Sequence, residues 1–155
     1  MKGKLYSACV QSVMIYGSEM WAVKVEDTQH LERTERMMVR WMCGVTLKDR
    51  KSSEELRKRL GIVSVSNMVS RRRLRWFGHV ERKNADDWVS PCRKLEVEGE
   101  RGRGRGRKLW KECVAYDMRK LKLKQEDAQD RAFWASGILG DRPTRASAEK
   151  RTLKR

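Results

Sequence analysis

Apolar residues recur every three or four positions along most of the chain, which is the period of an α-helix with one buried face. Proline is present only twice, so long stretches are free to be helical. The first helical segment is marked by Leu5, Cys9, Val13 and Tyr16, and Gly17 follows as a stop signal. No strand-like alternation is sustained in the sequence, so the pattern predicts a mostly α fold.

Two helices are predicted next. The first is capped by Asp27 or Thr28 and ends at Gly44. Its face is marked by Leu31, Glu35 or Met38, Trp41 and Met42. The second opens at Ser52 in a capping box, in which the serine and the glutamate three residues later satisfy each other's backbone donors, and it stops at Gly61.

A longer helix, capped by Ser64, is predicted to carry two different sides. One side is apolar and is lined by Ile62, Val65, Val69, Trp76 and Val80. The other side is basic and bears Arg71, Arg72, Arg73 and Arg75. For Trp76 we favour an anchoring role in the core over stacking on nucleic-acid bases, because it shares helical spacing with the apolar residues.

The remaining sequence alternates irregular and helical stretches. Turn-forming residues crowd positions 84–107, helical spacing resumes at Trp110 and continues to Leu121, and a last helix ends near Gly137–Gly140. The expected organisation is a thumb-like helical segment at 1–83, an irregular Arg/Gly-rich linker at 84–107, a C-terminal helical pair at 108–140 and a disordered basic tail at 141–155. This is a small irregular multi-helix bundle with one Gly/Arg-rich loop.

Charge narrows the choice of partner. The 155 residues include 37 Lys and Arg against 21 Asp and Glu, a formal net charge of +16. Such a surplus repels itself in a compact chain and favours a polyanion, most commonly nucleic acid; an anionic membrane surface is the other candidate. No apolar run approaches the ~20 residues of a membrane span, and no signal-peptide core is present. We therefore expect no membrane partner and an intracellular location, in the nucleus or the cytoplasm.

The sharpest local feature is an alternation of arginine and glycine at 101–107, which is followed by Lys108. Glycine leaves the backbone free, so that each guanidinium can reach a different phosphate or stack on a base. The alternative is a solvated flexible linker. The candidate nucleic-acid-binding residues, for DNA or RNA, are Arg71, Arg72, Arg73, Arg75, Arg101, Arg103, Arg105, Arg107 and Lys108.

The sequence offers little for catalysis. The only histidines are His30 and His79, and neither has a second ligand at metal-binding spacing. The four cysteines are scattered without a CxxC pair, which favours free thiols over a metal site or disulfides. No phosphate-binding glycine loop, nucleophile elbow or zinc signature is present. We expect a chain without enzymatic activity, cofactor or bound metal.

Several segments, taken in order, resemble the region that follows the polymerase core in reverse transcriptases of non-LTR (LINE-like) retrotransposons. They are residues 13–21 (VMIYGSEMW), 35–45 (ERMMVRWMCGV), 56–62 (LRKRLGI), 73–80 (RLRWFGHV), 101–110 (RGRGRGRKLW) and 130–134 (DRAFW). The resemblance implies a thumb-like segment and a C-terminal extension, which in the parent enzyme, an RNA-directed DNA polymerase, would pack against a palm and grip the template–primer duplex. The family's metal-binding aspartates lie upstream of the region that this chain resembles.

The chain departs from the family pattern at three positions. Gly104 stands where the family usually has proline, Leu109 where it has threonine and Ala135 where it has arginine. Such drift suits a decaying copy. Two alternatives to a nucleic-acid-binding fragment therefore remain: a translated retroelement remnant without a selected function, and a helical protein-interaction module.

Overall fold

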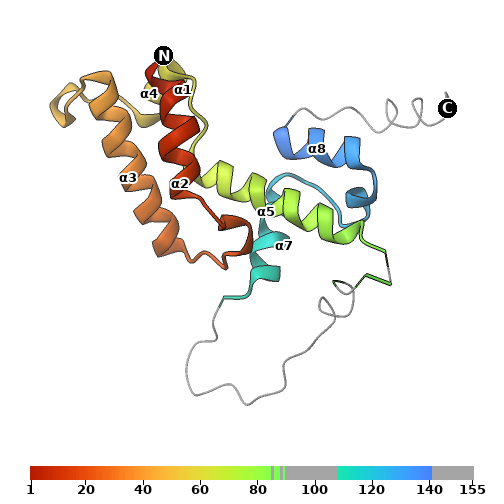
Figure 1. Cartoon of the computed structure of the whole chain (residues 1–155). Coiled ribbons are helices and arrows are strands. Elements are labelled where there is room, and N and C mark those ends of the chain that lie inside the picture. The colour runs from red at the N-terminus through yellow and green to blue at the C-terminus, as the bar shows by residue number, and fades with distance from the viewer. Residues whose placement is uncertain (85, 88, 90–107, 141–155) are drawn as a thin grey trace, which may run out of the picture. The chain divides into compact units, whose positions relative to one another are not determined.

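In the computed structural model, which describes residues 1–84, 86–87, 89 and 108–140, every regular element is a helix and no strand is present (Figure 1). The predicted mostly α fold is therefore confirmed. The chain divides into two compact units, and the division falls inside helix α5 (Val65–Glu81): the N-terminal unit is Met1–Ser70 and the C-terminal unit begins at Arg71. The predicted Arg/Gly-rich loop and basic tail lie outside the described residues.

The N-terminal unit begins with one helical run in three parts, α1 (Lys2–Leu5), a π-helix (Tyr6–Gln11) and α2 (Ser12–Met14). A 3₁₀ turn (Ser18–Met20), α3 (Val25–Cys43), a second 3₁₀ turn (Leu47–Asp49), α4 (Ser53–Leu60) and the first residues of α5 follow. Gly17, Gly44 and Gly61 have φ between 65° and 69°, a left-handed conformation that glycine adopts at little cost. The predicted stops at these positions are confirmed.

The face predicted for the first helix is wrong. The four residues that marked it are exposed: Leu5, Cys9, Val13 and Tyr16. The buried positions are Tyr6, Gln11 and Ile15, which are separated by five and then four residues. A π-helix repeats i→i+5 rather than i→i+4, so it shifts the buried face away from the 3.6-residue stripe. An apolar stripe is left facing solvent.

Two apolar clusters hold the N-terminal unit together. Tyr6, Val39, Leu56 and Ile62 form one cluster, and Ile15, Val23, Val65 and Val69 form the other. The backbone of Gly3 lies so close to Leu60 that a Cβ at this position would collide with the Leu60 carbonyl group. This glycine therefore allows α1 and α4 to touch through their backbones.

A buried carboxylate connects three segments of the same unit. Glu35 on α3 is 0% exposed; its Oε1 accepts hydrogen bonds from the backbone N–H of Val65 (2.9 Å) and from Gln11 Nε2 (3.3 Å), while Oε2 faces Arg57 Nη1 at 3.4 Å. Burial raises the pKa of Glu35 by more than Arg57 and the Val65 N–H lower it. Burial, with a smaller contribution from Glu35, also raises the pKa of Tyr6 to about 12.

The helix starts are partly as predicted. The hydroxyl of Ser52 accepts the backbone N–H of Glu55 (3.1 Å), whereas the Glu55 carboxylate lies 3.9 Å from Lys51. Helix α3 begins at Val25, two residues before Asp27, the first of the two predicted caps. Asp27 instead lies inside the first turn, where its carboxylate accepts the backbone N–H of Lys24 (3.1 Å). Such a contact compensates a donor at the helix end.

The C-terminal unit packs the rest of α5 against α7 (Trp110–Lys120), a 3₁₀ turn (Glu126–Gln129) and α8 (Arg131–Leu139). Its core consists of Leu74, Val114, Leu123, Ala128, Trp134 and Ile138. The indole N–H of Trp134 donates to the Leu74 carbonyl oxygen (2.9 Å), and the ring lies directly against the backbone of Gly78. Asp130 caps α8 by accepting the backbone N–H groups of Ala132 and Phe133 (2.9 and 3.1 Å).

No described helix is both long and apolar enough to cross a bilayer. Among the same residues, no group of three or more His, Cys, Asp or Glu side chains is arranged to hold a metal ion.

Candidate nucleic-acid interface

Helix α5 presents cations and aromatic rings on one face within the C-terminal unit. Arg72, Arg75, Trp76 and His79 are spaced i, i+3, i+4 and i+7, which places them on the same side of a helix; we refer to these four residues as the α5 face. Arg75 and His79 are exposed, Arg72 is half-buried and Trp76 is 38% exposed. The rings of Trp76 and His79 stack with 5.6 Å between their centroids.

The opposite side of α5 fixes this face in place. Leu74 is fully buried in the core of the unit. The ring of Phe77 packs against Trp110 of α7 and Trp134 of α8, with centroid distances of 6.3 and 5.9 Å. The α5 face is therefore held by a packed core on its reverse side.

The structure corrects the sequence prediction for Arg73. This side chain is 5% exposed, and its Nη1 donates to Asp117 Oδ2 on α7 over 2.7 Å. Position 73 lies beside Leu74 and one turn before Phe77, so it belongs to the core side of α5. A guanidinium that is buried and paired is unavailable to a phosphate, and Arg73 is removed from the candidate set.

Arg71 also makes an internal contact. Its Nη2 lies 3.4 Å from the carbonyl oxygen of Leu139, the last residue of α8, and the side chain is half-buried. A cation at this point satisfies a free carbonyl and opposes the negative end of the helix dipole. Arg71 therefore has a structural role at the end of α8.

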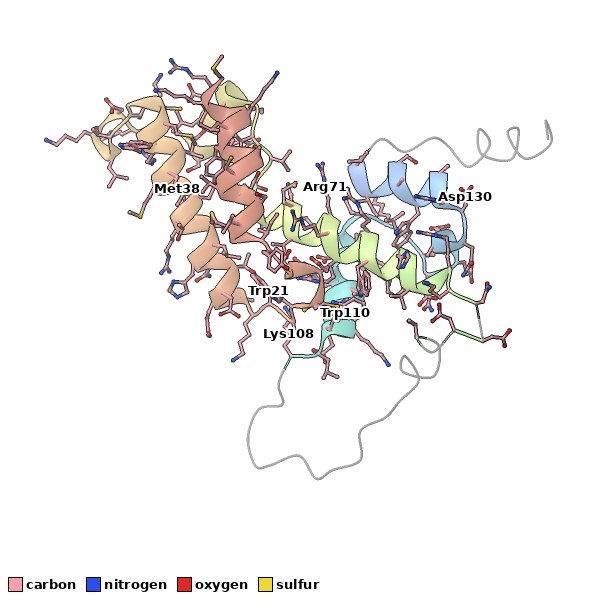
Figure 2. All side chains as sticks on the ribbon, in the orientation of Figure 1. Trp21, Met38, Arg71, Lys108, Trp110 and Asp130 are labelled. Carbon is pink, nitrogen blue, oxygen red and sulfur yellow. The ribbon has the colours of Figure 1, made fainter. Side chains whose placement is uncertain are left out.

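Lys108 is the one predicted ligand outside α5 that the structure describes. Lys108 is exposed and lies two residues before Trp110, the first residue of α7 (Figure 2). The Trp110 ring packs on Phe77 of α5. Glu112 Oε2 accepts the backbone N–H of Leu109 (3.0 Å), which caps α7 without a threonine hydroxyl. Because the Phe77–Trp110 contact belongs to the core side of α5, no contact of the described residues places Lys108 on the α5 face. The other predicted ligands lie outside the described residues: Arg101, Arg103, Arg105 and Arg107.

Comparison with known proteins gives one relative. Over 90 residues, 56% of this chain, the sequence is 27% identical to an uncharacterized transposon-derived protein of Caenorhabditis elegans, and the match covers 32% of that protein's length. The chain is similar to a transposon-derived protein. It spans about a third of the relative. No family model matches the chain, and no solved structure matches it.

The surplus positive charge is spread over all parts of the chain. Residues 1–70 carry 12 Lys and Arg against eight Asp and Glu, and the described residues from Arg71 onward carry 13 against eight. Seven of the 16 surplus positive charges therefore belong to residues that the structure does not describe. Both described units are basic, and no single unit holds the surplus.

Sequence reasoning missed two members of the α5 face. The apolar spacing favours a core position for Trp76, and His79 lacks a second ligand at metal-binding spacing. The signal was present as the i, i+3, i+4, i+7 spacing that joins both residues to Arg72 and Arg75. It was outweighed because Trp76 shares helical spacing with Val69 and Val80 as well.

Proposed function

We propose that this chain is a non-catalytic nucleic-acid-binding fragment of a retrotransposon reverse transcriptase that contacts the phosphate backbone. The observation that carries the proposal is the α5 face, where Arg72 and Arg75 share one helical face with two stacked rings. Lys108 and the arginines at 101–107 add further cations on the basis of the sequence alone. Similarity to a transposon-derived protein supports the transposon origin, and the sequence motifs support the narrower assignment to a reverse transcriptase.

The chemistry of the α5 face suits a backbone rather than a base sequence. A guanidinium is always charged and offers donors in a planar fork that matches phosphate oxygens. Contacts of this kind set affinity and position but carry no sequence information. We therefore expect similar affinity for nucleic acids of different sequence and a strong dependence on salt.

The test is binding to a mixed-sequence duplex across a salt series. The logarithm of the affinity should fall with the logarithm of salt concentration, with a slope of about −0.9 for each phosphate neutralised on DNA. Arg75→Gln should weaken binding and reduce this slope by about 1. Lys124→Gln is the matched control, because Lys124 is also exposed in the C-terminal unit but lies outside α5. A weak wild-type affinity that does not respond to salt would remove the proposal.

The polymerase reaction is not proposed for this chain. The catalytic aspartates of the family belong to a palm that precedes the matched motifs, and we expect no nucleotide incorporation on a primed template. We also propose that the chain works inside the cell, because a retroelement protein meets its nucleic acid in the nucleus or the cytoplasm.

One observation favours a second candidate, a helical protein-interaction module. Leu5, Val13 and Tyr16 leave an apolar stripe exposed on the first helical run, and exposed apolar patches often mark interaction surfaces. This candidate predicts that Val13→Ser with Tyr16→Ser changes the association state in sedimentation measurements while nucleic-acid affinity stays the same. Charge reversal in the Arg/Gly-rich run should weaken nucleic-acid binding and leave the association state unchanged.

A further inference from the structure

A second surface with aromatic and cationic chemistry lies in the N-terminal unit, where the start of α1 and the ends of α3 and α4 meet. An open hollow of about 480 Å³ is lined by Met1, Lys2, Gly3, Trp41, Met42, Cys43, Gly44, Arg59 and Leu60. Its volume lies within the range of small-molecule sites. Of the described residues that line it, two are cations and none is acidic.

Trp41 is the unexpected member of this surface. The sequence placed it on the buried face of α3, but the structure leaves it 85% exposed. Its neighbour one turn earlier, Met37, is exposed as well. A tryptophan whose ring is open to solvent can stack on another flat ring.

The residues around Trp41 are held in place by packing and backbone contacts. Beneath the hollow, Met42, Cys43 and Leu60 pack against the cluster of Tyr6, Val39, Leu56 and Ile62. Gly3 brings α1 against Leu60, and Gly44 ends α3 in a left-handed conformation beside Trp41. The Lys2 ammonium lies 3.4 Å from the Met42 carbonyl oxygen at the end of α3. The ring and the cations are thus presented by a packed scaffold.

We propose that Trp41, with Lys2 and Arg59, forms a stacking site for a single-stranded stretch of nucleic acid. An unpaired base has two free π-faces, and its flanking phosphates need nearby cations; the hollow offers one open ring and two exposed cations. A duplex hides its base faces inside the stack, so it gains nothing from Trp41. This inference rests on the proposed function, since it assigns one conformation of nucleic acid to a second surface of the same chain.

The experiment compares a short single-stranded oligonucleotide of mixed sequence with the duplex of the same sequence, using the full chain. Trp41→Leu should weaken single-strand binding roughly 5- to 150-fold, the loss of one base–aromatic stack, and should leave duplex binding unchanged. Trp41→Phe keeps a ring and should retain most of the affinity. Leu47→Ala is the matched control, because Leu47 is an exposed apolar residue of the same unit that does not line the hollow.

A spectroscopic measurement separates stacking from a structural effect. Saturating single strand should quench tryptophan fluorescence of the wild type more than that of Trp41→Phe, and circular dichroism of both should match because the side chain is exposed. Equal single-strand affinity of Trp41→Leu and the wild type would overturn the inference, as would an equal loss on single strand and duplex. Absence of salt-dependent binding to both would instead overturn the proposed function itself.

Discussion

Among the described residues, each unit has a buried carboxylate that faces an arginine. Glu35 bonds to Val65 and Gln11 and faces Arg57. Arg73 pairs with Asp117 over 2.7 Å, with both side chains at most 6% exposed. Removing charges from water is costly unless the partners are well placed. Both contacts therefore tie stability to single residues.

Glu35 should make stability depend on pH. Because burial raises the pKa of Glu35 in the folded chain, the folded state holds this proton more tightly than the unfolded state. The stability that the folded chain gains from this proton is fully present below the ordinary pKa of 4.5. It is lost as the pH rises through the raised pKa of Glu35. Glu35→Gln stays neutral, so its stability relative to the wild type should increase between acidic and neutral pH in urea denaturation. A constant difference in unfolding free energy between Glu35→Gln and the wild type across this pH range would contradict the prediction. Glu26→Gln is the control for the loss of one negative charge from α3.

Breaking the Arg73–Asp117 pair should be far more harmful than breaking an exposed pair. Asp117→Asn leaves a buried guanidinium without its counterion, at a cost of about 3–5 kcal/mol of unfolding free energy. Glu54→Gln removes the partner of Lys58, an exposed pair on α4, and should cost less than about 1 kcal/mol. Denaturant titrations measure both. Similar losses would mean that Arg73 reaches water in solution.

Replacing both partners tests the same contact from the other side. Arg73→Met combined with Asp117→Leu fills the space with apolar atoms, so it should be less destabilising than Asp117→Asn alone. A larger loss from the double replacement would show that the hydrogen bond, and not the unpaired charge, sets the stability.

At the scale of elements, local chemistry predicted helix ends better than helix faces. Gly44 and Gly61 ended their helices as expected, and Ser52 caps α4, because capping depends on a few neighbouring residues. Which face is buried depends on distant segments and on backbone irregularities. The π-helix at Tyr6–Gln11 changes which residues of the first helical run are buried, and the apolar spacing does not predict a π-helix. Trp41 was misplaced because a helical stripe does not reveal whether a partner covers it.

Helix α5 offers a test in which packing and helix propensity disagree. Gly→Ala in a helix interior normally stabilises by about 1 kcal/mol. At Gly78 an added Cβ would collide with Trp134, which is 2% exposed and anchored to the Leu74 carbonyl oxygen. Overpacking typically costs about 1–3 kcal/mol, so Gly78→Ala should destabilise the chain in thermal or urea unfolding. Asn67→Ala, at an exposed position of α5, should not.

Wild-type unfolding in the same measurement bears on the remnant alternative. A helical circular dichroism spectrum with a cooperative transition speaks against an unselected remnant that does not fold. A featureless coil spectrum would support it.

An increase in stability from Gly78→Ala would contradict the overpacking prediction and would show that Trp134 moves aside.

At the scale of the whole molecule, the candidate site was only partly predictable. Composition predicted the polyanionic partner, since every part of the chain has surplus cations. It could not separate Arg73, which pairs inside the fold, from Arg75, which faces solvent. The two arginines are only two positions apart on one helix, so their side chains leave it in different directions. Arg73 is distinguished by its partner Asp117, which lies 44 residues away along the chain. Long-range pairing of this kind leaves no local pattern.

The Arg/Gly-rich run should affect binding beyond its share of the charge. Changing Arg101, Arg103, Arg105 and Arg107 to Glu lowers the formal net charge from +16 to +8. If each arginine neutralises one phosphate, the salt slope on DNA should fall by about 3–4, with equal losses for all sequences. The control makes the same charge change at four exposed positions of the N-terminal unit: Lys24, Arg33, Arg36 and Lys48. Equal losses in both variants would reduce the effect to overall charge.

One helix belongs to both units, and this limits how the protein can be dissected. A cut between Ser70 and Arg71 would sever α5, leaving Val65 and Val69 on a six-residue stub and depriving the other part of the Ser64 cap. Stubs of this length do not stay helical in water. Fragments for biochemical work should therefore overlap: residues 1–81 and residues 64–140 would each retain the helix whole, at the expense of duplicating it.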